Sequence, residues 1–274
     1  MNKAVVIGSF DNLQSSDIRF LEEASRQGEL HVFVWADALA TLINGCQPEF
    51  PLEERIYLLH GIRYVNQVHV VEQLDSQNTF PLIPCHDNDT TTWVVPEAFN
   101  NGEKHRYCLL KAMQYHVVEQ ALIKDFPNAP NLFENPSKTK RVLVTGCYDW
   151  FHSGHLRFFE EVAQLGELYV VVGSDENVRL LKGEGHPLFP QDERRYVVGS
   201  IRFVKQTFIS TGSGWMDVGP EIELIKPDIY AVNEDGDKPE KRRFCEEHGL
   251  QYVVLKRLPR DGLPKRESTQ LRGF

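Results

Sequence analysis

The chain of 274 residues lacks the features that mark membrane proteins and disulfide-rich secreted proteins. No apolar run approaches the roughly 18 residues needed to cross a bilayer. The N-terminal sequence MNKAVVIGSF enters a predicted strand directly, with no signal-peptide core. The five cysteines are scattered and never have C-x-x-C spacing, so we expect reduced thiols and no zinc site. These absences predict a cytoplasmic protein without a membrane span.

Positive charge is also scarce in the chain as a whole. The formal net charge of −9 argues against general binding to nucleic acids or anionic membranes. The segment 238–272 is an exception, because it contains ten Lys and Arg against five Asp and Glu. A solvated helix face explains part of this excess, and a triphosphate site would explain the remainder.

The most informative segment is GCYDWFHSGH, at residues 146–155. It follows the short apolar run 142–144, which is typical of a buried strand, and it leads into helical apolar spacing over 153–165. His152 and His155 therefore stand at a predicted helix start. Free backbone N–H groups and the helix dipole favour phosphate oxygens at such a position, so the segment predicts chemistry on a phosphate.

This segment resembles the G-x-[FY]-D-x-x-H-x-G-H signature of the nucleotidyltransferase superfamily, and of its cytidylyltransferase branch in particular. Further matches follow in the family's order over 140–272, namely Ser174-Asp175-Glu176, Lys182 in a polar loop, RRYVVGSIRFV from Arg194, Trp215, Lys226-Pro227-Asp228 and Ser268-Thr269. The resemblance implies an enzyme in which a substrate phosphate attacks the α-phosphorus of CTP and pyrophosphate leaves. It also implies a phosphorylated small-molecule acceptor, with Mg²⁺ arriving on the nucleotide and no metal cage in the protein.

An internal repeat shows that the chain is duplicated. Residues 8–37 and 146–175 share 13 identities in 30 positions, where composition alone gives about two. In each copy we expect strand, helix, strand, polar loop, helix, strand, helix and strand. This alternation predicts an α/β fold of two Rossmann-like doubly wound parallel-sheet domains in tandem, at residues 1–125 and 140–274 with a linker at 126–139.

The first copy lacks both histidines of the motif. Gln14 and Asp17 stand in their places, and an aspartate would repel incoming phosphates. We therefore expect the first copy to be catalytically silent. Arg55 and Arg63, which match Arg194 and Arg202, would then support packing in an intrachain pseudo-dimer, and a further homodimer is left open.

The resemblance implies a role for each matching residue of the second copy. The expected catalytic residues are His152, His155 and Lys182, and Asp175, Lys182 and Trp215 are expected to bind the acceptor. The expected nucleotide-binding residues are Gly146, Cys147, Tyr148, Asp149, Gly154, Arg194, Asn233, Asp235, Ser268 and Thr269. Structural roles are the alternatives for Asp149 and Asp175, because the silent copy retains them as Asp11 and Asp37.

Two departures from the family pattern leave the acceptor undetermined. The sequence Asn233-Glu234-Asp235-Gly236 stands where glycerol-3-phosphate cytidylyltransferases resemble G-D-D-W, and RDGLPKREST replaces R-T-E-G-I-S-T-T. It is therefore open which of Arg257, Arg260 and Arg266 contacts phosphate.

Three functions stay open from the sequence. They are CTP-dependent transfer to a phosphorylated alcohol or sugar, ATP-dependent adenylyl transfer to a sugar phosphate or cofactor precursor, and non-catalytic nucleotide binding. The chain has no K-M-S-K-S segment, which argues against a class I aminoacyl-tRNA synthetase.

Overall fold

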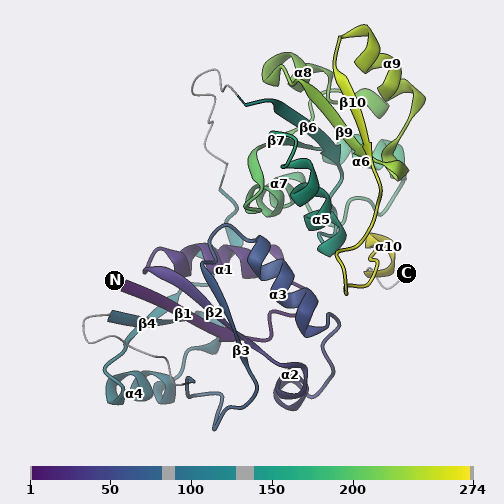
Figure 1. Cartoon of the computed structure of the whole chain (residues 1–274). Helices are drawn as coiled ribbons and strands as arrows, with labels where there is room; N and C mark the ends of the chain where they lie inside the picture. Colours follow the sequence, from purple (N-terminus) through teal and green to yellow (C-terminus); the bar gives the residue numbers. More distant parts are fainter. Residues whose placement is uncertain (1, 82–89, 128–138, 272–274) are drawn as a thin grey trace. The chain divides into compact units, whose positions relative to one another are not determined.

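The computed structural model describes residues 2–81, 90–127 and 139–271, apart from the side chains of Thr269 and Gln270. The chain divides into two compact units, Met1–Phe126 and Pro127–Phe274 (Figure 1). Each unit contains a five-stranded parallel sheet, with strand order β3-β2-β1-β4-β5 in the first unit and β10-β9-β6-β7-β8 in the second. Both units therefore have a Rossmann-like α/β fold.

Among the described residues, the two units follow the same order of elements except for two helices, α8 and α10, which only the second unit contains. The first unit contains β1 (Asn2–Gly8), α1 (Ser15–Ser25), β2 (Glu29–Trp35), α2 (Asp37–Asn44), α3 (Leu52–Gly61), β3 (Gln67–Val71), β4 (Thr90–Pro96), α4 (Gly102–Leu110) and β5 (Gln114–Val118). The second contains β6 (Arg141–Gly146), α5 (Ser153–Val162), β7 (Glu167–Val172), α6 (Asp175–Lys182), α7 (Gln191–Gly199), β8 (Val204–Ile209), α8 (Gly219–Ile225), β9 (Ile229–Asn233), α9 (Pro239–Glu247), β10 (Gln251–Leu255) and α10 (Ser268–Leu271).

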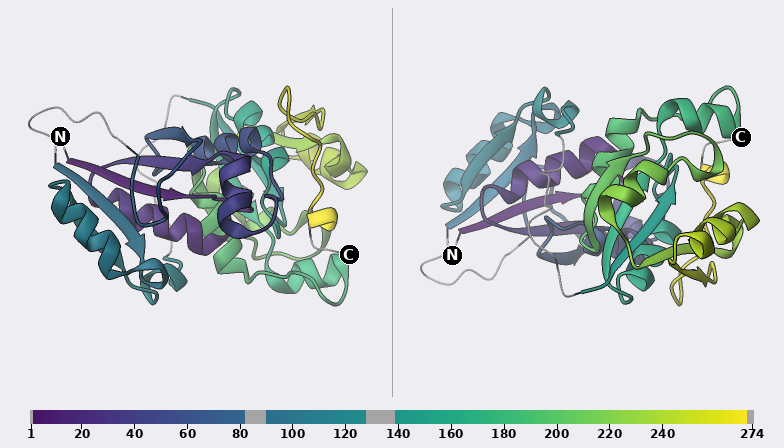
Figure 2. Two further views of the ribbon diagram at one scale, coloured as in Figure 1. Left: turned by 90° about the horizontal axis from the view of Figure 1, so that it is seen from below. Right: turned by 90° about the horizontal axis from the view of Figure 1, so that it is seen from above.

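Helices cover both faces of the second sheet, which explains the continuous apolar runs of its central strands. Figures 1 and 2 show α5 and α7 on one side of this sheet and α8 and α9 on the other. On the α8 side, Leu143, Tyr169 and Tyr230 pack with Ile222 and Cys245 in one core cluster. A sheet buried on both faces requires apolar side chains at successive positions, and each fully buried aliphatic side chain contributes about 1.5–3 kcal/mol.

The structure corrects three details of the predicted elements. Each sheet has five strands where four were expected, because the segments after Arg63 and Arg202 form β3 and β8. Lys182 lies at the end of α6 and not in a loop: the Ser174 hydroxyl caps this helix by accepting from Asn177 N (3.2 Å), and Gly183 ends it with φ +86°. Helix α5 ends at Val162, three residues before the predicted end of its apolar spacing.

The first unit differs from the second between its third and fourth strands. Residues 72–81 contain no helix, whereas α8 occupies the corresponding crossover of the second unit.

Within the described ranges, no helix is long and apolar enough to cross a membrane.

Candidate active site

The turn between β6 and α5 has a strained backbone that both copies retain. Tyr148 has φ +52°, as does its equivalent Phe10 with φ +48°, a conformation that costs a residue other than glycine about 1–3 kcal/mol. The Tyr148 ring lies over Gly146, where an added Cβ would come within 2.6 Å of a ring carbon. The ring also contacts His155 edge-on, with 5.4 Å between centroids. Gly146 therefore allows Tyr148 to support the side of His155.

His152 is the N-cap of α5, and its contacts define its tautomer. Its Nδ1 accepts a hydrogen bond from Gly154 N (3.1 Å), so the proton is on Nε2 and Nε2 is a donor. A Cβ on Gly154 would lie 3.0 Å from the His152 ring, which explains the glycine. Among the described residues, neither His152 Nε2 nor His155 Nδ1 has a hydrogen-bond partner, although both are buried. The two rings stack with 4.0 Å between their centroids, so both of these nitrogens can contact the same bound group.

Both histidines are neutral at physiological pH. Burial, followed by the positive charges of Arg257 and Arg266, lowers the pKa of His152 to about 3. Burial, His152, Arg257 and Lys182 hold the pKa of His155 well below its usual value. The imidazoles can therefore donate hydrogen bonds to phosphate but do not supply positive charge, which comes from the arginines and Lys182.

The structure distinguishes the three arginines that the sequence left open. Arg257 donates to Asp235 Oδ2 (2.6 Å) and to the Arg266 carbonyl (3.3 Å). Its positive charge contributes to the lowered pKa of both histidines. Arg260 instead lies 3.8 Å from Glu160, on α5. The geometry thus favours Arg257 and Arg266 as the cations nearest a phosphate bound at the histidines.

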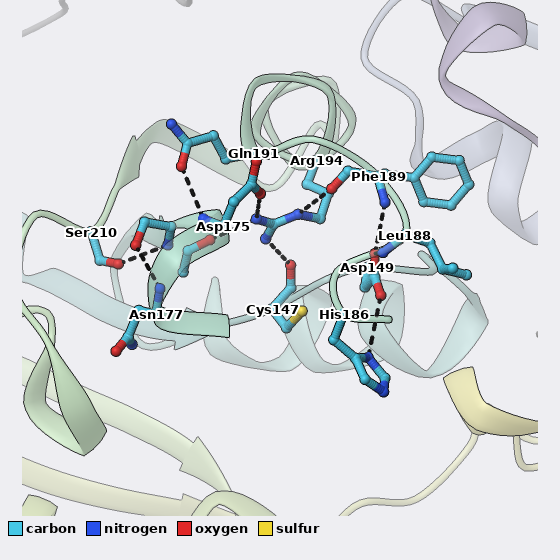
Figure 3. A network of polar contacts seen from close by, with 12 residues as sticks. Cys147, Asp149, Asp175, Asn177, His186, Leu188, Phe189, Gln191, Arg194 and Ser210 are labelled. Carbon is cyan, nitrogen blue, oxygen red and sulfur yellow. Dashed lines mark hydrogen bonds and ion pairs between the residues drawn. The ribbon is translucent and has the colours of Figure 1, made fainter. Parts of the chain in front are cut away.

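Arg194 and Asp149 fix the β6–α5 turn to the neighbouring segments of the second unit (Figure 3). The Arg194 guanidinium is 1% exposed and donates to the carbonyls of Phe189 (2.9 Å), Cys147 (2.6 Å) and Gly173 (2.8 Å). It also donates to Asp175 Oδ1 (2.7 Å). Asp149 Oδ1 accepts from the backbone of Leu188 (2.7 Å) and Phe189 (3.0 Å). These contacts favour structural roles for Arg194, Asp149 and Asp175.

The first copy contains the same network. Arg55 is fully buried and donates to the carbonyls of Phe50 (3.0 Å) and Trp35 (2.9 Å) and to Asp37 (2.5 Å). Asp11 accepts from Glu49 N (2.8 Å) and Phe50 N (2.9 Å). Because a copy without the histidines keeps these contacts, the network supports the fold and does not require a nucleotide.

The first copy differs from the second at the start of its helix. The side chains of Gln14 and Asp17 form a reciprocal capping box at α1, in which Gln14 N donates to Asp17 Oδ2 (2.9 Å). Burial raises the pKa of Asp17. Backbone donors that would be available to an anion are thereby satisfied within the chain, which agrees with the expectation that this copy is silent.

The remaining predicted residues have varied surroundings. Ser268 Oγ donates to the Trp150 carbonyl (3.2 Å), next to the histidine motif, whereas the Thr269 side chain is outside the described residues. Asn233 ends β9 and is paired with Leu255 in the ladder. Trp215 is 52% exposed and lies under the Lys238 ammonium group (5.3 Å), and no described contact joins it to the histidines.

Asn177 is a site residue that the sequence analysis missed. It is 4% exposed, accepts from Gly214 N (2.7 Å) and donates to Asp217 Oδ2 (2.8 Å). It thereby ties α6, the helix that carries Lys182, to the loop that carries Trp215. Its position three residues after the helix-capping Ser174 was the only signal in the sequence.

The second unit is thus an α/β unit with a Rossmann-like sheet, two buried histidines at a helix start and three cations, Arg257, Arg266 and Lys182, whose charges act on them. Residues 143–257 match the family described as "Cytidylyltransferase-like". The chain belongs to this nucleotidyltransferase family.

Relatives with curated names match the chain over about half of its residues or less. The FAD synthase of Ferroglobus placidus is 37% identical over 43% of this chain and 75% of that protein. The FAD synthase of Thermococcus kodakarensis is 37% identical over 45% of this chain and 83% of that protein. The bifunctional protein HldE of Campylobacter concisus is 32% identical over 41% of this chain and 24% of that protein.

Proposed function

We propose that the second unit transfers a nucleoside monophosphate from a nucleoside triphosphate to a phosphorylated alcohol or sugar. The observation that carries this proposal is the pair of buried ring nitrogens, His152 Nε2 and His155 Nδ1, without partners among the described residues. They lie at the N-terminal end of α5, where the helix dipole favours phosphate oxygens.

In this reaction, an oxygen of the acceptor phosphate attacks the α-phosphorus of the nucleotide. The new P–O bond forms as the bond to the β-phosphate breaks, and pyrophosphate leaves with the electron pair. His152 donates a hydrogen bond from Nε2 to an oxygen on the α-phosphate. The neighbouring His155 binds the same phosphate through Nδ1. Arg257, Arg266 and Lys182 balance the charge that develops on the leaving pyrophosphate.

A Mg²⁺ ion would accompany the nucleotide in this proposal. The described residues contain no group of three His, Cys, Asp or Glu side chains able to hold a metal. The phosphate oxygens would therefore provide most of its ligands, as Mg²⁺ commonly accepts in phosphoryl-transfer sites. The ion would neutralise charge on the triphosphate, and the protein would orient the phosphates.

The donor base has two candidates. CTP is the donor that the resemblance to cytidylyltransferases favours. ATP is favoured by the relatives named FAD synthase, because the product in their name contains an adenylyl group joined to a phosphate. The histidine motif itself contacts phosphate and does not discriminate between the bases.

The experiment that tests the proposal is a pyrophosphate-release assay on the full chain. CTP and ATP are each combined with Mg²⁺ and with glycerol 3-phosphate, phosphoethanolamine, phosphocholine, ribose 5-phosphate or FMN. The His152→Ala protein is the blank. Release that depends on both nucleotide and acceptor supports the proposal, and nucleotide binding without release in any combination contradicts it.

A further inference from the structure

Lys241 on α9 is a buried charge that the proposed reaction does not use. Its side chain is 9% exposed, and its ammonium group makes no hydrogen bond or ion pair with the residues that the structure describes. The ammonium nitrogen lies over the Tyr230 ring, 5.9 Å from the ring centroid. Burial lowers the pKa of Lys241, and a hydrogen-bond acceptor on a bound ligand would stabilise its charged form.

Asp217 provides the opposite charge. It is also 9% exposed, and its Oδ2 accepts from Asn177 (2.8 Å) while its Oδ1 accepts nothing from the described residues. Lys241 is attracted by Asp217, yet the two do not form an ion pair. A hydroxyl group can bridge such a gap, because it donates to a carboxylate and accepts from an ammonium group.

The pair lies close to the elements of the candidate active site. Asp217 Oδ2 is 3.9 Å from the position of a Cβ on Gly173, and Gly173 N donates to the carbonyl of Gly146 (2.9 Å). Lys241 is also attracted by Asp235, the residue that holds Arg257. Gly146 ends β6, and Asp235 follows β9. These two strands are neighbours at the point where the strand order reverses, and ligands of open α/β sheets bind there.

We infer that Lys241 and Asp217 bind neighbouring hydroxyl groups of a substrate, and that this substrate is a sugar or polyol compound. The inference rests on the proposed function and adds the chemical class that this part of the site recognises. The two charges cancel, so the pair suits neutral hydroxyl groups better than a further phosphate. The hydroxyl groups belong to the ribose of the nucleotide or to the acceptor.

Binding to the full chain, measured by titration calorimetry, tests the inference with ligands that differ in one hydroxyl group. ATP and CTP are compared with their 2′-deoxy and 3′-deoxy forms, and ribose 5-phosphate with 2-deoxyribose 5-phosphate. Wild-type protein is expected to bind at least one hydroxylated ligand about tenfold more tightly than its deoxy form. Lys241→Met should abolish this ratio. Arg242→Met is the matched control, because Arg242 pairs with Asp237 on the exposed side of α9 (2.8 Å), and it should keep the ratio.

The outcomes separate the two sources of the hydroxyl groups. A ratio lost only for the nucleotides assigns the pair to the ribose, and one lost only for the pentose phosphates assigns it to the acceptor. Equal ratios in wild type and Lys241→Met, or no ratio in wild type, overturn the inference. Failure of the proposed function is distinguishable, since binding ratios are measurable even where no pyrophosphate is released.

A measurement on the unaltered protein guards against a folding defect. Methionine is unbranched like lysine and carries no charge that burial would penalise, so Lys241→Met should preserve Tm and fold. Independently, trace acetylation of Lys241 in wild-type protein should slow several-fold with the hydroxylated ligand and not with its deoxy form. Equal acetylation rates with both ligands would overturn the inference.

Discussion

Replacing Arg194 by methionine should destabilise the second unit by about 3–5 kcal/mol, the usual consequence of removing one partner from a buried charged network. The change leaves three backbone carbonyls and the Asp175 carboxylate without their donor. The Asp175 side chain is 34% exposed, so solvent screens its share, and most of the loss comes from the carbonyls. Against a typical total of about 5–15 kcal/mol, this loss is severe.

The matched variant is Arg55→Met in the first unit. Arg55 makes the equivalent contacts at similar distances, so its replacement should destabilise the first unit by a similar amount. Hydrogen–deuterium exchange of the full chain, resolved by peptide, reads the opening free energy of each unit separately. Each variant should accelerate exchange in its own sheet.

The result that would refute this reasoning is an Arg194→Met protein with unchanged exchange and weakened nucleotide binding. It would mean that the guanidinium serves the nucleotide, as the resemblance to the family implied, and not the turn. The milder Arg194→Lys change should give an intermediate loss of stability, because lysine cannot reach all four acceptors.

Three further outcomes are expected. The pKa of His152 lies at about 3 in the folded protein, below its ordinary value of 6.5. Its contribution to stability is therefore complete above about pH 6.5 and decreases as the pH falls toward 3. Urea unfolding at pH 8 and at pH 5 should show a smaller loss of stability between the two pH values for His152→Asn than for wild type. Gln14→His with Asp17→His should restore no transfer in a His152→Ala background, and measurable pyrophosphate release would contradict the silence of the first copy. Gly146→Ala should lower Tm by several degrees, because its Cβ would overlap the Tyr148 ring, and an unchanged melting curve would count against the packing described.

The repeat and the motif carried most of what the sequence could predict. Periodicity and the 13 identities between the copies were enough to predict two parallel-sheet units, because two copies of one sequence are expected to adopt the same fold. The assignment of His152, His155 and Lys182 to one site came from the resemblance to the nucleotidyltransferase family, and not from periodicity. The structure brings the charge of Lys182 to His155.

The contacts that depend on side chains from distant segments could not be predicted. Arg194 resembled a nucleotide ligand until its four acceptors were visible. Lys241 appeared to belong to a solvated helix face, since burial of a lysine depends on packing that periodicity does not encode. Neither the extra strand of each sheet nor the helix α8 that follows it in the second unit was predicted, and the sequence did not signal that residues 72–81 of the first unit contain no equivalent helix.

The most direct test of the central claim compares pyrophosphate release by wild-type protein with release by His155→Ala, at saturating nucleotide and acceptor. Loss of a preorganised hydrogen-bond donor at the α-phosphate should reduce kcat by about 10²–10³-fold, while the fold, checked by circular dichroism, is retained. Equal rates in the two proteins would contradict the assignment of transfer to the histidines of the second unit.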